Sequence, residues 1–359
     1  MILLLILCGM GLLSGFLLMA RVPLYASPQD GSGSSEDERV AIIIPARNEE
    51  RNLPRLLESI QHHPALAEVI VVDDGSTDRT PAIAESYHTR IIHPGEPPQN
   101  VTGKAWACFK GATSTDVSHL LFLDADTFFI GNGLSRVLQS YAPAASGTAI
   151  SVLPFAITKK PYEELSLFFN LLMAFGAGGF GAFQPPRLFG QSLLIQHALY
   201  DKVGGHAAVG NFVLENFHMA RQLEAAGARI RCFGGKGTLH MRMFPEGLQQ
   251  LSDGWTKAFA DGAQSTDIRV LLVSILWLSV LASTTILLWV TPHQQRWMAE
   301  LLYLLAVTQV YFFAREIGTF RPWTCLLFPL PLVFFFLVFT RSFLRRALGQ
   351  RTNWRGRNV

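Results

Sequence analysis

Runs of apolar residues divide the chain into a middle part of short alternating elements and longer apolar segments on both sides. Between residues 40 and 267, the β-rich runs VAIIIPA, EVIVVDD and HLLFLDAD are each followed by a stretch with helical periodicity. The runs are continuously apolar, as in strands buried on both faces. The middle part is therefore predicted to be an α/β domain with a Rossmann-like, mostly parallel sheet covered by helices.

The flanking apolar segments indicate attachment to a membrane. Residues 1–20 contain no charged residue and are long enough to cross a bilayer core. A cleaved signal peptide would require Lys or Arg before the apolar run, and none precedes it. We therefore predict a transmembrane anchor followed by a polar linker over 21–39. Residues 268–342 hold three further apolar segments, predicted to be transmembrane or re-entrant, and 343–359 form a basic tail.

One of these segments is expected not to cross the membrane fully. Four full spans would place the Arg-rich tail and the middle domain on opposite sides, whereas both are expected in the cytoplasm. Two alternatives remain open: a re-entrant hairpin at 322–340, which contains Pro329 and Pro331, or an interfacial segment at 297–314. The uncharged stretch 165–183 is either a buried core helix or an element at the entrance for an apolar acceptor.

Composition agrees with a partly membrane-embedded protein. Of the 359 residues, 49% are hydrophobic and 16% charged, against about 25% charged in ordinary soluble domains. This excludes a disordered chain and a nucleic-acid binder with a global basic field. Residues 1–269 carry a net charge of −4 and residues 270–359 one of +7. The four cysteines are far apart and form no CxxC motif, so neither a disulfide framework nor a zinc site is expected.

Two acidic motifs follow predicted strands. Asp73 and Asp74 end the run EVIVVDD, which is the ligand-binding edge of an open parallel sheet, although they are also typical helix caps. Asp124 and Asp126 are predicted to alternate on a strand and to point the same way. Two such carboxylates suit a divalent cation that neutralises a diphosphate leaving group; the alternative is an acidic surface turn.

Three further stretches carry candidate polar groups. Lys104 opens a predicted helix, and both the N-terminus of the helix and the ammonium group would attract an anion there. The alternative is an ordinary surface lysine. Glu215 begins another helix and is either a general base or a first-turn charge. Further on, Arg242 and Lys257 are candidates for pairing with phosphates, and Trp255 for stacking on a sugar or filling the core.

The order of these motifs resembles the family 2 glycosyltransferases with the GT-A fold, over about residues 40–263. More narrowly, GKAWACFKGA, GQSLLIQHALYDKVGGH and MFPEGLQQLSDGWTKAFADGA look like the carotenoid-acid (4,4'-diaponeurosporenoate) branch. The resemblance implies an inverting enzyme of the plasma membrane with a cytoplasmic catalytic domain. It would transfer one sugar, glucose by expectation, from a UDP-sugar to an apolar lipid acceptor such as a carotenoid carboxylate, without a nucleic-acid partner.

The resemblance also implies roles for individual residues. It places donor binding at Pro45, Ala46, Arg47, Glu49, Asp73, Asp74, Lys104, Asp124, Arg242, Trp255 and Lys257. It places Mg²⁺ or Mn²⁺ at Asp126, Asp124 and His240, and the catalytic acid at Glu215. Trp255 matches the tryptophan of the QxxRW motif of processive enzymes, but Ser252, Asp253 and Gly254 precede it, which favours transfer of a single sugar.

Asn216 departs from the family pattern, because an aspartate usually completes an acidic pair there. An alcohol acceptor needs a base to remove its proton, whereas a carboxylic acid is already ionised at neutral pH. We therefore expect that a carboxylate acceptor makes the missing acid dispensable. Glu215 serving as base for an alcohol remains an alternative, as do polyprenyl phosphate, sphingolipid or hopanoid acceptors, and a non-catalytic membrane scaffold with a degenerate GT-A domain.

Overall fold

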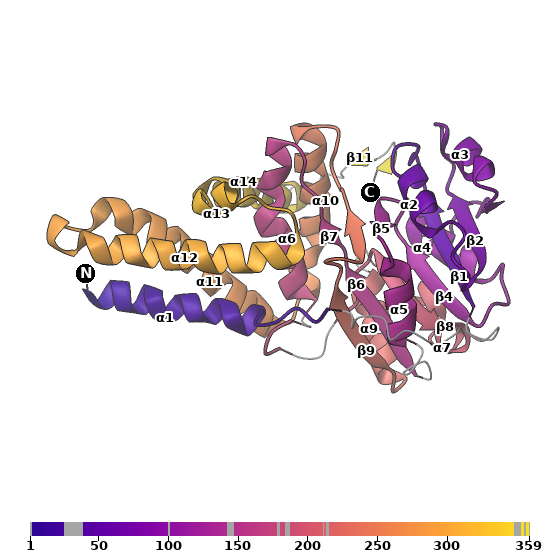
Figure 1. Cartoon of the computed structure of the whole chain (residues 1–359), viewed down its shortest axis with the longest axis horizontal. Coiled ribbons are helices and arrows are strands. Elements are labelled where there is room, and N and C mark those ends of the chain that lie inside the picture. Colours follow the sequence, from indigo (N-terminus) through magenta and orange to yellow (C-terminus); the bar gives the residue numbers. More distant parts are fainter. Residues whose placement is uncertain are drawn as a thin grey trace. The chain divides into compact units, whose positions relative to one another are not determined.

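The chain forms two compact units, which we call the sheet unit and the helical unit (Figure 1). The computed structural model describes residues 2–24, 39–99, 101–141, 147–177, 180–183, 187–210, 212, 215–347, 353–354 and 357–358, without the side chains of 257–265, 346–347, 353–354 and 357–358. The sheet unit comprises Pro23–Phe155 and Pro186–Arg242; the helical unit comprises Met1–Val22, Ala156–Pro185 and Met243–Val359. Residues 156–185 and 243–267 of the predicted 40–267 domain thus group with the helices. Most of the predicted linker, residues 25–38, lies outside the described residues.

A seven-stranded sheet in the order β3-β2-β1-β4-β8-β6-β9 organises the sheet unit. Its strands are β1 (Val40–Ala46), β2 (Leu66–Asp73), β3 (Arg90–Ile92), β4 (His119–Leu123), β6 (Thr148–Leu153), β8 (Ser192–Gln196) and β9 (Arg229–Gly234). Only β8 runs antiparallel to its neighbours, so the predicted mostly parallel sheet is confirmed.

The strand order reverses at β1, which pairs in parallel with β2 on one side and β4 on the other. In open α/β sheets, ligands bind in the crevice outside the carboxyl ends of the strands at such a switch point. The carboxyl ends of β1, β2 and β4 are followed by the three motifs Arg47–Glu49, Asp73–Asp78 and Asp124–Asp126. The fold therefore gathers these motifs at one edge.

Helices cover both faces of the sheet because alternate strand residues are apolar on each side. One core joins Ile42 and Ile44 to helices α2 (Leu53–Ile60), α3 (Thr80–Ser86) and α5 (Gly133–Tyr141). The opposite core joins Ile43 to helices α4 (Gly103–Ala112), α7 (His197–Lys202), α8 (Gly205–Val209) and α9 (Glu215–Ala225). A Cβ on Gly111 would lie 2.4 Å from Ile43, so this glycine lets α4 pack closely on β1.

The helical unit contains long apolar helices. Its elements are α1 (Ile2–Leu18), η3 (Pro161–Ser166), α6 (Leu167–Gly176), α10 (Leu248–Ser265), α11 (Ile268–Val290), η4 (His293–Gln295), α12 (Arg296–Ile317), α13 (Pro322–Leu326), α14 (Pro329–Ala347), β11 (Asn353–Trp354) and β12 (Arg357–Asn358). Two stretches, Ile268–Val290 and His293–Ile317, are long and apolar enough to cross a membrane, whereas α1 has 17 residues.

Helices α1, α11 and α12 run side by side, and their contacts fix their directions (Figure 1). Gly9 faces Leu302 and Gly15 faces Gln309, so α1 and α12 are parallel. Gly11 faces Val280 and Gly15 faces Trp277, so α1 and α11 are antiparallel. The end of α1, the start of α11 and the end of α12 therefore share one end of this three-helix bundle.

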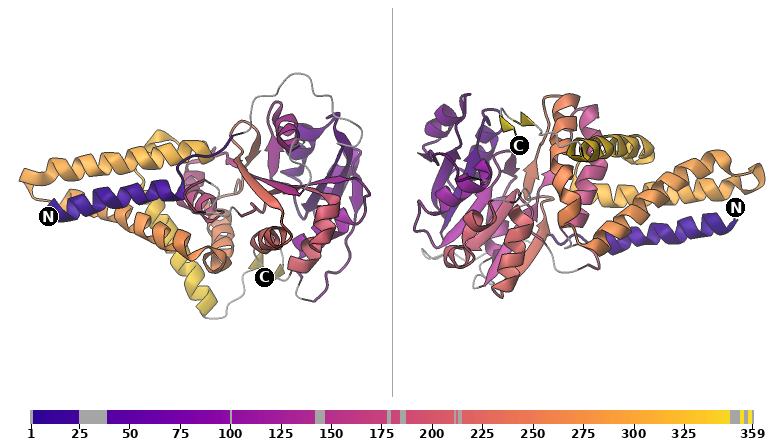
Figure 2. Two further views of the ribbon diagram at one scale, coloured as in Figure 1. Left: turned by 90° about the horizontal axis from the view of Figure 1, so that it is seen from below. Right: turned by 180° about the vertical axis from the view of Figure 1, so that it is seen from behind.

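The apolar segment 322–340 is not one straight helix. It divides into the short α13 and the longer α14, which starts at Pro329 because proline is tolerated in the first turn of a helix but not in its interior. Figure 2 shows α14 lying across the direction of α12, and Figure 1 views α14 nearly end-on. By contrast, 297–314 lies within the 22-residue helix α12.

Within the stretch 165–183, the structure favours the core-helix interpretation. Residues Leu167–Leu171 of α6 are all buried, and Asn170 donates from Nδ2 to the carbonyl of Ser166 at 3.0 Å. Phe169 stacks on Trp255 with 4.8 Å between the ring centroids. Gly178 and Gly179, in the same stretch, lie outside the described residues.

A buried polar network holds the three-helix bundle together at Gly15. Gln309 donates from Nε2 to the carbonyl of Leu12 at 2.7 Å and accepts from Trp277 Nε1 at 2.8 Å. A Cβ on Gly15 would lie 2.7 Å from Trp277 Nε1 and 2.9 Å from Gln309 Nε2. The close approach of α1 to the other two helices therefore requires glycine.

We expect Gly15→Ala to lower the free energy of unfolding by about 1–3 kcal/mol, because Trp277 and Gln309 must move apart. Gly9→Ala is the matched control: its Cβ would lie 3.8 Å from Leu302, an ordinary contact, and alanine is the better helix former. Thermal unfolding of the two purified variants measures the difference. Equal melting temperatures would contradict the described packing.

Candidate active site

The loops after β1 and β2 are joined by hydrogen bonds at the edge where ligands are expected. Arg47 donates to the carbonyl of Asp74 at 3.0 Å, and Asp73 Oδ1 accepts from the Ser76 amide at 3.2 Å. Asn48 adopts a positive φ of 54°, which asparagine tolerates better than most residues. Its Oδ1 accepts from the Thr77 amide at 2.8 Å. The two predicted donor-binding segments thus form one rigid edge.

Not every predicted residue of this edge exposes its side chain. Ala46 and Asp73 are 2% and 3% exposed, and Glu49 is buried while accepting from Asn52 Nδ2 at 2.8 Å. Asp73 also lies 3.4 Å from His93 Nδ1. Pro45, Arg47 and Asp74 are partly exposed. Ala46 and Glu49 are therefore placed to shape the loop, whereas Arg47 and Asp74 are accessible.

Lys104 joins three separate parts of the sheet unit. Thr102 caps α4 by accepting from the Ala105 amide, which places Lys104 in the first turn, as predicted. Its Nζ lies 2.7 Å from Asp124 Oδ1 and donates to the carbonyl of Gly190 at 2.9 Å. Burial lowers the pKa of Lys104, but the carboxylates of Asp124 and Glu215 outweigh it and raise that pKa above its usual value.

Glu215 begins α9, as the sequence predicted, and lines a small cavity beside Lys104. The cavity, of about 20 Å³, also contacts Asp124, Cys108, His206 and Asn216; this volume holds about one water. Asn216 donates from Nδ2 to the carbonyl of Leu188. Its amide therefore holds the loop that leads into β8.

His206 belongs to the same cavity although sequence reasoning did not select it. The Tyr200 hydroxyl lies 3.0 Å from His206 Nδ1 and accepts from the His206 amide at 3.0 Å. Burial, and then the charge of Lys104, lower the pKa of His206 to about 3, so its ring is neutral at pH 7. One hint in the sequence was the pair Gly204–Gly205 directly before His206, and both glycines adopt a positive φ, of 76° and 53°.

The expectation that Asp124 and Asp126 alternate on a strand was wrong. β4 ends at Leu123, and the two acids occupy a turn in which the Asp124 carbonyl accepts from the Thr127 amide at 3.0 Å. The chain must reverse there to start β5 (Thr127–Phe129). Asp124 consequently contacts Lys104, while Asp126 adjoins the ribbon of β5 and β10 (Leu239–Met241).

This antiparallel ribbon places His240 and Arg242 near Asp126. His240 pairs with Phe128, and the Arg242 amide lies 3.5 Å from the Asp126 carbonyl. Directly opposed residues, and residues two apart, share one face of a β-ribbon. Burial, and then the charge of Arg55, lower the pKa of His240 to about 4, so the imidazole is neutral at pH 7.

A divalent cation fits this face with few protein ligands. Among the described residues, no group of three or more His, Cys, Asp or Glu side chains is placed to hold a metal. Mg²⁺, however, is usually bound by one or two carboxylates, with substrate phosphates and water completing its shell. The Nε2 of His240 is buried and has no hydrogen-bond partner among the described residues. Asp126 and His240 therefore fit such an ion, whereas Asp124 is engaged by Lys104.

Trp255 and Lys257 belong to the helical unit. Trp255 is 1% exposed, stacks on Phe169 and donates from Nε1 to Ser166 Oγ at 3.1 Å. Of the two interpretations from sequence, core filling therefore holds and sugar stacking does not, because no face of the ring is accessible. The side chain of Lys257 lies outside those described.

Sequence comparison identifies the family of the chain. Residues 41–209 match the profile of Glycosyl transferase family 2. A 4,4'-diaponeurosporenoate glycosyltransferase of Staphylococcus haemolyticus is 32% identical over 277 residues, which cover 75% of this chain and 74% of the relative. The enzyme of that name from Staphylococcus aureus (strain MRSA252) is 31% identical over 327 residues, 89% of this chain and 87% of the relative. The chain belongs to glycosyl transferase family 2 and is a glycosyltransferase.

Solved structures were also compared with the chain. A mannosyltransferase from Pyrobaculum calidifontis in complex with GDP-Man and Mn²⁺ is 19% identical, with a TM-score of 0.49 and coverage of 80% of this chain and 91% of the other. Glucosyl-3-phosphoglycerate synthase from Mycobacterium tuberculosis, with Mn²⁺, UDP and its product, is 17% identical, with a TM-score of 0.46 and coverage of 68% and 88%.

We expect Asn216→Asp to lower the free energy of unfolding by about 1–3 kcal/mol, although it introduces the acid that the family resemblance implies at this position. The new carboxylate cannot donate to the Leu188 carbonyl and would repel it. Asn132→Asp, at an exposed position before α5, is the matched control. A melting temperature for Asn216→Asp equal to that of the control would show that the hydrogen bond from the Asn216 side chain to the Leu188 carbonyl does not contribute to stability.

Proposed function

We propose that this glycosyltransferase is a membrane-bound inverting enzyme that transfers one glucose from UDP-glucose to the carboxylate of an apolar, carotenoid-like acid. Its relatives carry the name 4,4'-diaponeurosporenoate glycosyltransferase, and the suffix -oate in the first word denotes a carboxylate. The observation that carries the proposal is the arrangement around Lys104. There Glu215 adjoins a cation, and Asn216 occupies the position of the second acid with its amide bound to Leu188.

The donor is assigned to the edge formed by the loops after β1 and β2. The exposed parts of Arg47 and Asp74 offer a cation and a carboxylate for a base and ribose, and ligands of open α/β sheets bind at this edge. Uridine is the nucleoside that the family resemblance implies. The diphosphate would then extend toward Asp126, His240 and Arg242, which lie together on the β5–β10 ribbon.

Asp126 and His240 would hold the Mg²⁺ or Mn²⁺ ion, which when bound supplies positive charge to the departing diphosphate. His240 is neutral at pH 7, as a metal-ligating imidazole must be. Arg242, whose backbone amide lies 3.5 Å from the Asp126 carbonyl, would add a positive charge to this group. These residues therefore position and neutralise the leaving group without transferring a proton.

Transfer to a carboxylate is balanced without a base. A carboxylate oxygen of the acceptor attacks C1 of the sugar, the bond from C1 to the diphosphate oxygen breaks, and its electron pair leaves with UDP. No proton has to move, so positioning and leaving-group stabilisation are the main requirements. Lys104 holds Asp124 beside Glu215 at the edge where the sugar would lie, so the protein supplies orientation there.

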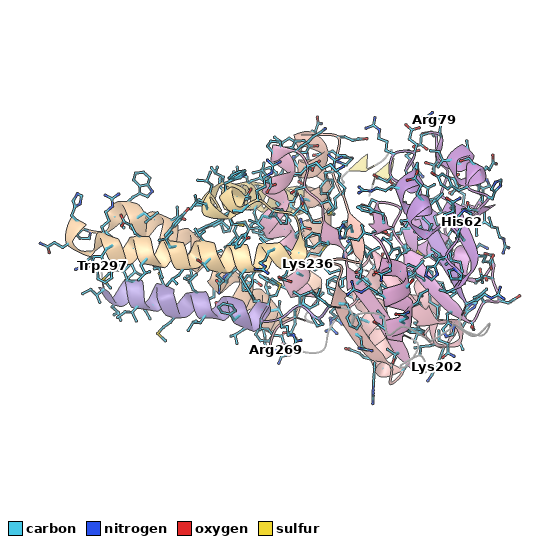
Figure 3. The ribbon with its side chains drawn as sticks, viewed as in Figure 1. His62, Arg79, Lys202, Lys236, Arg269 and Trp297 are labelled. Carbon is cyan, nitrogen blue, oxygen red and sulfur yellow. The ribbon has the colours of Figure 1, made fainter. Side chains whose placement is uncertain are left out.

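The helical unit is proposed to anchor the enzyme through three membrane spans, α1, α11 and α12. Helix α11, with 23 residues, is about 34 Å long, against about 30 Å for a bilayer core. Trp289 and Trp297 are 84% and 61% exposed where α11 ends and α12 begins, as expected in an aromatic belt. Trp297 and Arg269 mark opposite ends of the bundle (Figure 3).

Three membrane spans would place the sheet unit and the basic tail on the same side of the membrane, whereas four spans would place them on opposite sides. Arg21, Arg269 and Arg315 flank the bundle end at which α1 leads to the sheet unit and α12 leads to α13. Positive charge favours the cytoplasm, so the sheet unit and the basic tail share that side.

Helix α14 is proposed to lie in the membrane surface. Its exposed residues Leu330, Val333, Phe336 and Leu337 form an apolar side. Arg341 fastens α14 to α10 by donating to Ser252 Oγ and Asp253 Oδ1, both at 3.0 Å.

We expect Glu215→Gln to keep most of the transfer activity, with a loss below about tenfold, whereas removing a true general base costs about 10²–10⁴-fold. For the same reason the transfer rate should be flat between about pH 5.5 and 8, since a base with a pKa near 6 would titrate in that range. Glucose transfer from UDP-glucose, with Mg²⁺ or Mn²⁺, measures both. Glu85→Gln, exposed on α3, is the control. A steep fall of the rate toward acid pH, together with a large loss in Glu215→Gln, would indicate an alcohol acceptor with Glu215 as its base.

We expect a cysteine placed at His293 to react with a membrane-impermeant maleimide on intact cells. His293 is exposed in the connection between α11 and α12. This connection lies at the end of the bundle opposite the one where α1 leads to the sheet unit. Lys202→Cys, exposed on α7 of the sheet unit, should react only after permeabilisation. The four native cysteines are buried, so background labelling is low. The reverse labelling pattern, or protection of both sites, would contradict three spans with a cytoplasmic sheet unit.

A further inference from the structure

Arg55 is a cation that the sequence motifs did not single out. It lies on α2, and its guanidinium carbon is 3.3 Å from the centre of the Phe128 ring. The residue is exposed, and its guanidinium makes no hydrogen bond or ion pair with any described residue. A guanidinium stacked flat on an aromatic ring keeps its N–H edge available for a planar or tetrahedral anion.

Phe128 places this cation at the proposed catalytic face. It pairs with His240 across the β5–β10 ribbon, with their rings 5.7 Å apart and nearly perpendicular. Two positions further along, just outside the two strands, the Arg242 amide lies 3.5 Å from the Asp126 carbonyl. Arg55 therefore shares one face with the two residues that fit a divalent cation and with a second arginine.

The two arginines of this face also act on one another electrostatically. Burial, and then the charge of Arg242, lower the pKa of Arg55. Like charges held close together destabilise each other, and an anion bound between them relieves this repulsion. A bidentate contact from a guanidinium to phosphate oxygens is also among the stronger polar contacts in proteins.

We propose that Arg55 binds the diphosphate of the nucleotide-sugar donor and stabilises the negative charge that appears on it as the sugar leaves. The inference rests on the proposed function and adds a residue to it. A diphosphate is favoured over the acceptor carboxylate because Asp126 and His240, which suit a phosphate-bridging metal, lie on the same face. The stacking on Phe128 orients the guanidinium, so lysine is a poor substitute.

The test is calorimetric binding of UDP, UMP and uridine to the full-length protein in detergent, with Mn²⁺ present. Arg55→Gln should weaken UDP binding about ten- to a hundredfold, as expected for loss of a charge-assisted contact, and leave uridine within about twofold. Arg55→Lys should fall between Arg55→Gln and the wild type, because the charge stays but the stacked fork is lost. Arg229→Gln, exposed on β9 at the edge of the sheet, is the matched control and should bind all three like the wild type.

Each other outcome overturns the inference in a recognisable way. UDP binding unchanged in Arg55→Gln would remove Arg55 from the donor site. An equal loss for UDP and uridine would assign it a structural role, and a raised KM for the acceptor with unchanged UDP affinity would assign it to the acceptor. A wild type that does not bind UDP would overturn the proposed donor itself, and the inference with it.

Discussion

The ion pair between Lys104 and Asp124 is the contact on which the candidate site depends. Lys104 comes from the first turn of α4, Asp124 from the turn after β4, and the Gly190 carbonyl from the approach to β8. Glu215, at the start of α9, adds its charge to the same lysine. The side chains of Lys104 and Asp124 are 39% and 25% exposed, so both charges are partly buried, and their pairing and hydrogen bonds offset the loss of water around them. Four segments distant in sequence are therefore held in one arrangement at the switch point of the sheet.

This ion pair also separates the two acids of the DAD motif. Asp124 is committed to the lysine, and the turn directs the following residues toward the β5–β10 ribbon. The site thus has one half around Lys104 that orients the reactants, and a second half in which the neutral His240 accompanies the cations Arg242 and Arg55. Such a division suits a reaction limited by departure of an anion rather than by removal of a proton.

Much of the fold could be predicted from sequence because periodicity reports local burial. The run VAIIIPA is β1 to the residue, and Glu215 begins α9 as expected. The long apolar runs identified α11 and α12. The positions and contacts of individual side chains were harder to predict. Asp124 and Asp126 were placed on a strand because nothing local marks the turn that β5 requires, and Trp255 gave no sign of its partner Phe169, which is 86 positions away. Arg55 lies in an ordinary amphipathic helix. Only the pairing of β5 with β10 shows that its partner Phe128 lies next to His240.

The central claim is that the acceptor attacks through a carboxylate, and the linkage of the product tests it most directly. The lipid extract of cells that contain this protein, compared with cells that lack it, should show a hexose mass increment on an apolar acid. Neutral hydroxylamine should then release the sugar and leave a hydroxamate of the acid, because a sugar attached through a carboxylate is an ester. A hexose that stays attached after hydroxylamine would indicate an ether-type glycoside or a phosphate linkage, and would contradict this account.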